Sequence, residues 1–154
     1  MNDTIEEEGV DLVHTIVLSH PSSRPTNINI ATSNLTATSI DDYTSFINTL
    51  IIDGTIDPAN ANTQITFNIT TIIDDLHEPV QETLAVIGQV TSNNVGLQDL
   101  DKIGTILDIA PDPTIIISNP TVVEGNTLAF TLSMINPNTS LPTQNYQAID
   151  FEIE

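Results

Sequence analysis

The sequence is poor in basic residues and contains no cysteine. Only Arg24 and Lys102 are basic among 154 residues, against 21 acidic residues, so the formal net charge is −19. Binding to nucleic acid or to an anionic membrane surface depends on basic side chains that neutralise phosphates, so both partners are excluded. Without cysteine the chain has no disulfide, no cysteine-based zinc site and no thiol chemistry.

Features of membrane proteins and enzymes are also scarce. No apolar run reaches the roughly 18 residues that a membrane-spanning helix needs, so we expect no membrane insertion. The residues after Met1 read NDTIEEE and lack the apolar core of a signal peptide. An extracellular protein with this sequence would therefore be a piece of a longer chain. With six glycines, no tryptophan and no G-x-S-x-G motif, the chain is not expected to be an enzyme.

The composition nevertheless predicts a folded protein. Hydrophobic residues make up 39% of the chain and the mean hydropathy is +0.06, which argues for a packed core rather than disorder. Charged residues make up only 15%, so the surface is mainly threonine, asparagine and serine. On such a surface the carboxylates repel one another unless a cation neutralises them.

Short, β-branched apolar segments predict an all-β protein. In several of them apolar and polar residues alternate, as in Ile65, Phe67 and Ile69, with Thr66 and Asn68 between them. Turn-forming residues separate the segments, and none has the period of a helix. The predicted strands are Val13–Ser19, Asn27–Thr32, Gln64–Ile73, Glu82–Thr91, Ile103–Asp108, Thr114–Ser118 and Leu128–Met134. Their spacing favours a Greek-key, immunoglobulin-like β-sandwich.

The sequence also contains an internal echo. Glu8-Gly9 precedes VHTIVLS and Glu124-Gly125 precedes LAFTLS, and the closing serines, Ser19 and Ser133, are 133 − 19 = 114 residues apart. A repeat of that length is one sandwich per unit. We therefore predict a sandwich over 1–110 and an incomplete second repeat over 111–154, joined by a stiff proline-containing segment.

Acidic motifs recur at the ends of the predicted strands. They are Glu6–Glu8 before Gly9, TATSIDDYT, IIDDLHEPVQETL and GTILD. In this order the motifs resemble the Calx-β domain, the calcium-binding sandwich of sodium–calcium exchangers and of large bacterial surface adhesins. The resemblance covers residues 5–110 and begins again at 113 with PTIIISNPTVVEGNTLAFTLS.

The resemblance implies that Ca²⁺ is bound in the loops at one end of the sandwich. The implied ligands are Glu8, Asp42, Asp74, Asp75, Glu78 and Asp108. Their chemistry agrees, because calcium takes six to eight hard oxygen ligands. The sequence departs from the family pattern where Ile109-Ala110 follows Asp108 in place of further acids. The DDLHE loop also differs by one residue in its spacing to the E-T that follows.

Other interpretations of the same residues stay open. The acidic loops could simply be solvated, and His77 among its acids could mark a transition-metal site. Paired carboxylates also occur in glycoside hydrolases, but the chain lacks an aromatic sugar platform. Threonine pairs such as Thr70-Thr71 occur in ice-binding arrays, although threonine is also an ordinary strand residue.

Taken together, the sequence predicts a calcium-binding structural or adhesive repeat of a large extracellular bacterial surface protein, in which calcium rigidifies the joint between repeats. The expected partners are neighbouring repeats, other copies of the chain, and a cell-surface or glycan receptor bound through other domains. Two alternatives stay open. One is a strand-donating subunit of an extracellular filament, in which 111–154 supplies strands. The other is a regulatory calcium sensor or accessory domain of a transporter or secreted enzyme.

Overall fold

A computed structural model describes the chain except for residues 58, 60–61, 93–94, 97–98, 139–143 and 146–154. The chain divides into two compact units. Unit 1 comprises Met1–Ile73 and Gln81–Leu107, and unit 2 comprises Asp74–Val80 and Asp108–Glu154. The predicted domain boundary at residue 110 stays a prediction.

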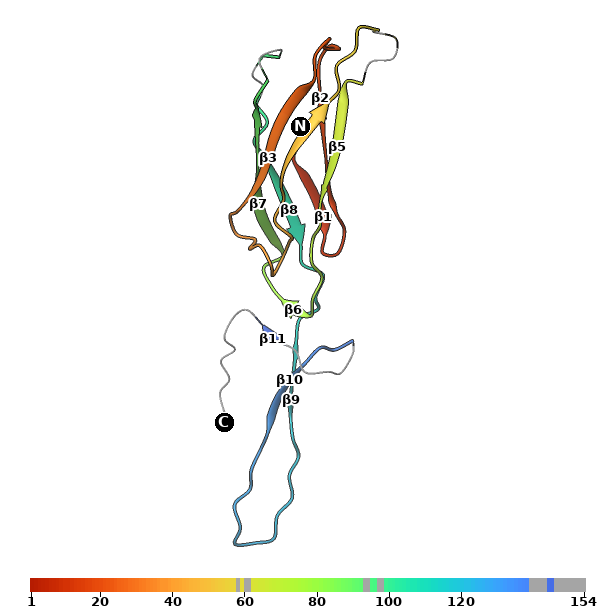
Figure 1. Ribbon diagram of the computed structural model, residues 1–154. Coiled ribbons are helices and arrows are strands. Elements are labelled where there is room, and N and C mark those ends of the chain that lie inside the picture. Colours follow the sequence, from red (N-terminus) through yellow and green to blue (C-terminus); the bar gives the residue numbers. More distant parts are fainter. Residues whose placement is uncertain (58, 60–61, 93–94, 97–98, 139–143, 146–154) are drawn as a thin grey trace. The chain divides into compact units, whose positions relative to one another are not determined.

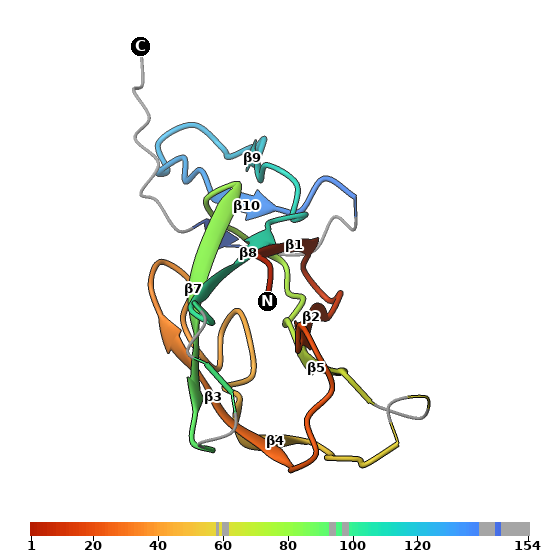
Figure 2. The same ribbon diagram turned by 90° about the horizontal axis from the view of Figure 1, so that it is seen from above.

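The described residues of unit 1 form strands in two sheets. The strands are β1 (Thr4–Glu7), β2 (Leu12–Val17), β3 (Thr26–Asn34), β4 (Ile47–Ile52), β5 (Gln64–Ile69), β7 (Gln81–Val90) and β8 (Lys102–Leu107). One sheet has five strands in the order β1-β8-β7-β3-β4, and the other pairs β2 with β5. Figure 2 shows the larger sheet curled, with β2 and β5 lying across from β3 and β7. This is the predicted all-β sandwich.

The alternation of apolar and polar residues explains the core of unit 1. In β2 the side chains of Leu12, His14 and Ile16 are buried, while those between them are more exposed. In the larger sheet β3, β4, β7 and β8 alternate over part of their length, whereas β1 is mostly exposed. The buried apolar residues of these strands are Leu12, Ile16, Ile28, Ile30, Leu50, Ile52, Phe67, Ile69, Leu84, Val86 and Ile106. Each such side chain stabilises the fold by roughly 1.5–3 kcal/mol relative to exposure.

Two adjacent strands at one edge of the larger sheet run parallel. β1 pairs with β8 in a parallel register from Thr4 opposite Gly104 to Glu7 opposite Leu107. β7 pairs with β8 in an antiparallel register that sets Gln81 opposite Leu107. The ends of β1 and β8 and the start of β7 therefore lie in one row at one end of unit 1.

Unit 2 contains β6 (Leu76–His77), β9 (Thr114–Ile117), β10 (Leu132–Ile135) and β11 (Gln144–Asn145). β9 and β10 form an antiparallel hairpin, visible in Figure 1, and β11 pairs in parallel with β6. Every residue of β9 is exposed. Among the described residues, all the buried hydrophobic side chains belong to unit 1.

The strand predictions are right in type and differ at several ends. Strand β5 ends at Ile69, whereas the predicted strand ends at Ile73. Strand β10 begins at Leu132, whereas the predicted strand begins at Leu128. The sequence reading missed β1, β4, β6 and β11. No α-helix occurs among the described residues. Accordingly, no helix long and apolar enough to cross a membrane is found in that part of the chain.

Candidate metal site

The row of strand ends in unit 1 carries acidic residues. Glu8 follows β1 directly, and its backbone amide donates a hydrogen bond to the Leu107 carbonyl at 3.1 Å. Its side chain is buried. Glu82 is the second residue of β7 and lies opposite Ile106 of β8. The sheet register therefore brings Glu8 and Glu82 to the same end of unit 1.

The loop after β3 is fixed against the start of β7. The amides of Thr36 and Ala37 both donate to the carbonyl of Thr83, at 3.0 and 2.8 Å. The Thr83 amide in turn donates to the Thr36 hydroxyl at 2.7 Å. Because Thr83 is the neighbour of Glu82, these bonds hold the loop that carries Asp41 and Asp42 beside that glutamate.

Asp42 is oriented by a tight turn. Its carboxylate accepts the Thr38 amide at 2.5 Å, and its own amide donates to the Thr38 carbonyl at 3.0 Å. Its carbonyl accepts the Ile72 amide at 2.9 Å. Within this turn Ile40 adopts a φ of 94°, which is unfavourable for a β-branched residue. The turn thus contains a strained backbone conformation at Ile40, and its hydrogen bonds fix the position of the Asp42 carboxylate.

Tyr43 packs beneath this turn. Its side chain is 1% exposed, and its hydroxyl donates to the Asn34 side-chain carbonyl. Burial, helped by the nearby Asp42 charge, raises the pKa of Tyr43 above its usual value, against a smaller lowering by the Thr32 side chain. The residue therefore supports the acidic loop as a neutral core group.

Asp42 and Glu82 together form the candidate metal site of unit 1. Their carboxylate oxygens lie within 4.8 Å of each other. Asp42 is 6% exposed and Glu82 is half-buried. Two carboxylates at this distance repel each other, and burial of one of them strengthens the repulsion. A divalent cation that prefers oxygen ligands would relieve this repulsion and use both groups as ligands.

The two basic side chains are located elsewhere in unit 1. Lys102 opens β8, and its ammonium group pairs with Asp99 at 3.0 Å. Arg24 precedes β3, whereas the acidic loop follows the end of that strand. Lys102 and Arg24 therefore lie near the starts of β8 and β3, whereas the acids lie near the ends of these strands. Neither is placed to neutralise Asp42 and Glu82.

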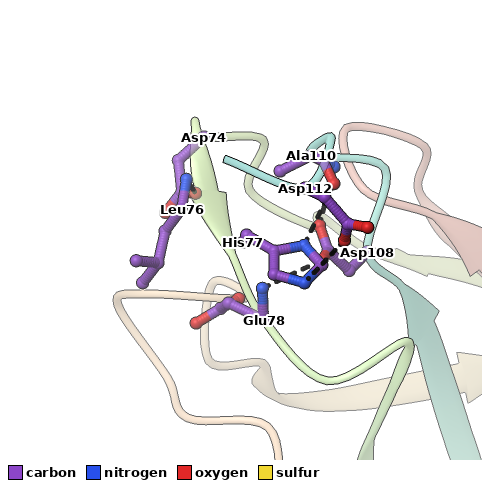
Figure 3. Close-up of polar contacts among 7 residues, drawn as sticks. All are labelled: Asp74, Leu76, His77, Glu78, Asp108, Ala110 and Asp112. Carbon is purple, nitrogen blue, oxygen red and sulfur yellow. Dashed lines mark hydrogen bonds and ion pairs between the residues drawn. The ribbon is translucent and has the colours of Figure 1, made fainter. Parts of the chain in front are cut away.

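Acidic residues of unit 2 gather around Asp108, as shown in Figure 3. The Asp108 carboxylate accepts the amides of Glu78 at 2.9 Å and Ala110 at 2.7 Å. The His77 ring contacts it at 3.3 Å and contacts Asp112 at 3.1 Å through its other nitrogen. Asp108 therefore links Asp74–Val80 to the residues that follow β8, and both ring nitrogens of His77 face aspartates.

The remaining predicted ligands also lie in unit 2. Asp74 is exposed and accepts the Leu76 amide at 2.6 Å, a local turn that orders the start of the loop. Asp75 is exposed, and its carboxylate accepts a hydrogen bond from the Asn136 side chain at 3.4 Å. Glu78 is half-buried.

Within unit 1 the structure thus brings the predicted ligand Asp42 next to Glu82, which is outside the predicted ligand set. The predicted ligand Glu8 follows the end of β1 in the same row of strand ends. Glu82 belongs to the acidic motif IIDDLHEPVQETL, but sequence alone does not show that it faces Asp42. The set of six predicted ligands stays a prediction.

Comparison with known proteins identifies the architecture. No family model and no curated protein matches the chain. The solved structure of the apo-form Calx CBD1 domain matches with a TM-score of 0.59 and 17% identity, covering 70% of this chain and 90% of that one. The chain has the Calx-β fold.

Two longer solved structures share this Calx-β architecture. The CBD12 structure from CALX1.2 matches with a TM-score of 0.59 and 16% identity, and covers 70% of this chain. The calcium binding domain CBD12 of CALX1.1 matches with the same TM-score and 17% identity. This chain spans 41% and 42% of their respective lengths. At these identities the likeness establishes the Calx-β fold, and the chemistry has to be argued from the residues.

Proposed function

We propose that the protein is a calcium-binding structural module of a large extracellular bacterial surface protein. The observation that carries calcium binding is the pair of carboxylates in unit 1, Asp42 and Glu82, with oxygens within 4.8 Å of each other. The solved CALX1.1 structure of the same fold is described as a calcium binding domain. The role is binding and mechanical rather than catalytic.

Calcium fits this pair better than zinc or copper does. Both side chains offer only hard carboxylate oxygens, which suit calcium, magnesium and manganese, whereas zinc and copper favour nitrogen or sulfur ligands. Calcium also tolerates irregular geometry and completes its shell with backbone carbonyls and water. Glu8, buried in the same row of strand ends, is the third acid that we assign to this end of unit 1.

The extracellular repeat role rests on the sequence. The internal echo indicates tandem units, and a threonine- and asparagine-rich surface with two basic residues suits a secreted bacterial repeat. In such an array calcium would neutralise the acids of each unit, and neutralisation at 108–112 would stiffen the segment that joins successive repeats. Removal of calcium would restore the repulsion and loosen the array.

A calcium titration of thermal stability tests the proposal. We expect the unfolding temperature of the full chain to rise as calcium increases to about 1–10 mM, since a ligand that binds only the folded state stabilises it. The double variant Asp42→Asn/Glu82→Gln should lose most of this rise. An unchanged unfolding temperature at millimolar calcium would contradict the proposal.

Two further variants make the test specific. Asp53→Asn/Glu124→Gln changes the same number of charges at exposed sites outside the cluster, and it should keep the calcium response. Asp74→Asn/Asp75→Asn alters two exposed predicted ligands of unit 2. A reduced number of bound ions in this variant, measured by calorimetry, would assign a calcium site to that loop. An unchanged number would remove both residues from the ligand set.

A further inference from the structure

One edge of the smaller sheet in unit 1 is open. Among the described residues β2 forms a ladder only with β5. The Leu18 amide donates to the Thr63 carbonyl at 2.7 Å, on the β5 side. Successive residues of an antiparallel strand direct their backbone N–H and C=O groups toward opposite neighbouring strands. The backbone groups of Thr15 and Val17 therefore point away from β5, to the other edge of β2. This edge can accept another strand.

A cavity of about 480 Å³ lies beside the end of this edge. Its apolar wall includes Ile16, Leu18, Ile28, Val90 and Leu100. None of the described residues lining it is acidic, although the chain contains 21 acidic residues. Two copies of a chain with a net charge of −19 repel each other, so an uncharged surface of this kind is where close approach costs least.

In unit 2 the hairpin of β9 and β10 indicates which strand could pair with the open edge of β2. β9 lies along β10, and the hydrogen bonding continues where the Ser118 amide donates to the Thr131 carbonyl at 2.9 Å. The repeated Glu-Gly motifs of the two units are 124 − 8 = 116 residues apart, and the serines that close the repeated strands are 114 residues apart. Under the first separation Thr131 corresponds to Thr15, and under the second it corresponds to Val17. The backbone groups of both residues point to the open edge of β2. β9 is therefore the counterpart of a strand at the edge of β2 that no described strand occupies.

The same correspondence determines which side chains of β9 would face the core. Both separations are even, so they give the same orientation in a strand. Ile117 pairs with Leu132, which corresponds to Ile16 or Leu18, and both of these face the core or pack against it. Ile115, two residues earlier, has the same orientation. The intervening Ile116 faces the opposite side.

The β9 isoleucines are exposed, and no buried hydrophobic side chain surrounds them among the described residues of unit 2. Ile115, Ile116 and Ile117 are 39%, 46% and 60% exposed. Ile115 pairs with Met134, which corresponds to Leu18 under the 116-residue separation. The cavity beside Leu18 is therefore the place for Ile115. An uncharged, β-branched strand of this kind is well suited to strand addition.

We propose that β9 of a second copy of this chain adds to the open edge of β2 and inserts Ile115 into the adjacent cavity. The donor strand and the acceptor edge are different surfaces, so the contact is heterologous and repeats from copy to copy as an open chain. The inference is independent of calcium binding, because the cavity contains no acidic residue. It is tested in the presence of a calcium chelator.

The test uses light scattering of the full chain at high ionic strength, which screens the repulsion between copies. We expect the mass to rise above that of a monomer as the concentration increases to about 1 mM. Ile115→Glu should abolish this association, because it places a charge in the cavity. The matched variant Ile116→Glu changes the other face of the same strand and should retain it.

A complementation experiment shows the direction of donation. An added Cβ at Gly96 meets no described atom within 4 Å, and Gly96 lines the cavity, so we expect the bulky side chain of Gly96→Phe to block the acceptor. Ile115→Glu alone and Gly96→Phe alone should each be monomeric. Their mixture should form a one-to-one dimer, because one partner retains the acceptor and the other the donor. A strict monomer in the wild type and in the mixture, or equal association of the Ile115 and Ile116 variants, would overturn the proposal.

Discussion

Replacing Glu82 by glutamine should stabilise the protein without calcium and weaken its response to calcium. The Asp42 and Glu82 oxygens lie within 4.8 Å of each other. For two unit charges at that separation, Coulomb's law gives about 1 kcal/mol at the permittivity of water and about 3 kcal/mol at the effective permittivity of a protein surface. Glutamine removes this repulsion and retains the size and one oxygen of the side chain.

The assay is thermal unfolding in chelator and in excess calcium. In chelator, we expect Glu82→Gln to unfold several degrees above the wild type, at about 4 °C per kcal/mol for a domain of this size. In calcium the order should reverse, because the variant has lost a ligand. High salt should reduce the difference seen in chelator. A variant that is less stable than the wild type in chelator, with an unchanged calcium response, would refute the reasoning, and Asp53→Asn controls for a general loss of negative charge.

Three further predictions concern single residues. Burial lowers the pKa of His14 below 6.5, against smaller raising effects of Asn2 and Asp3. Stability should therefore be lost as the pH falls below the unfolded value of about 6.5, and His14→Phe should flatten this dependence in unfolding measured from pH 7 to 5. Ile40→Gly should raise the free energy of unfolding by up to about 1 kcal/mol in chemical denaturation, because Ile40 is exposed and its positive φ suits glycine. Asp108→Ala removes the acceptor of the Glu78 amide, costing roughly 1–3 kcal/mol locally, so hydrogen exchange at Glu78 should accelerate.

Alternation of apolar and polar residues makes a strand predictable from sequence, and β1 and β4, where it is absent or hidden, are not predicted. β2 and β3 alternate cleanly because they cover the core, and both are predicted. β1 contains two glutamates and is mostly exposed, so its own sequence has no apolar face. Its pairing with β8 depends on residues far along the chain and cannot be predicted locally. In β4 both faces carry isoleucine, and Ile47 is 82% exposed, which hides the period of two.

The candidate site shows the same limit. The motif containing Asp42 predicts an acidic loop at a strand end, and the structure has one. The proximity of Glu82 depends on the Thr36 and Thr83 hydrogen bonds and on the sheet register. These contacts join residues 47 positions apart, and no local pattern records them. Composition and motif order can thus suggest a cation, but only the folded chain selects which carboxylates face each other.

The parallel pairing of β1 with β8 also determines how unit 1 responds to force. The two strands lie side by side from Thr4 opposite Gly104 to Glu7 opposite Leu107 and run in the same direction. A pull on the chain before β1 and after β8 acts along both strands in opposite senses. It loads their hydrogen bonds in shear, all at once, instead of opening them one at a time like a zipper. In the proposed array of repeats, this short ladder would have to break under tension before the unit extends.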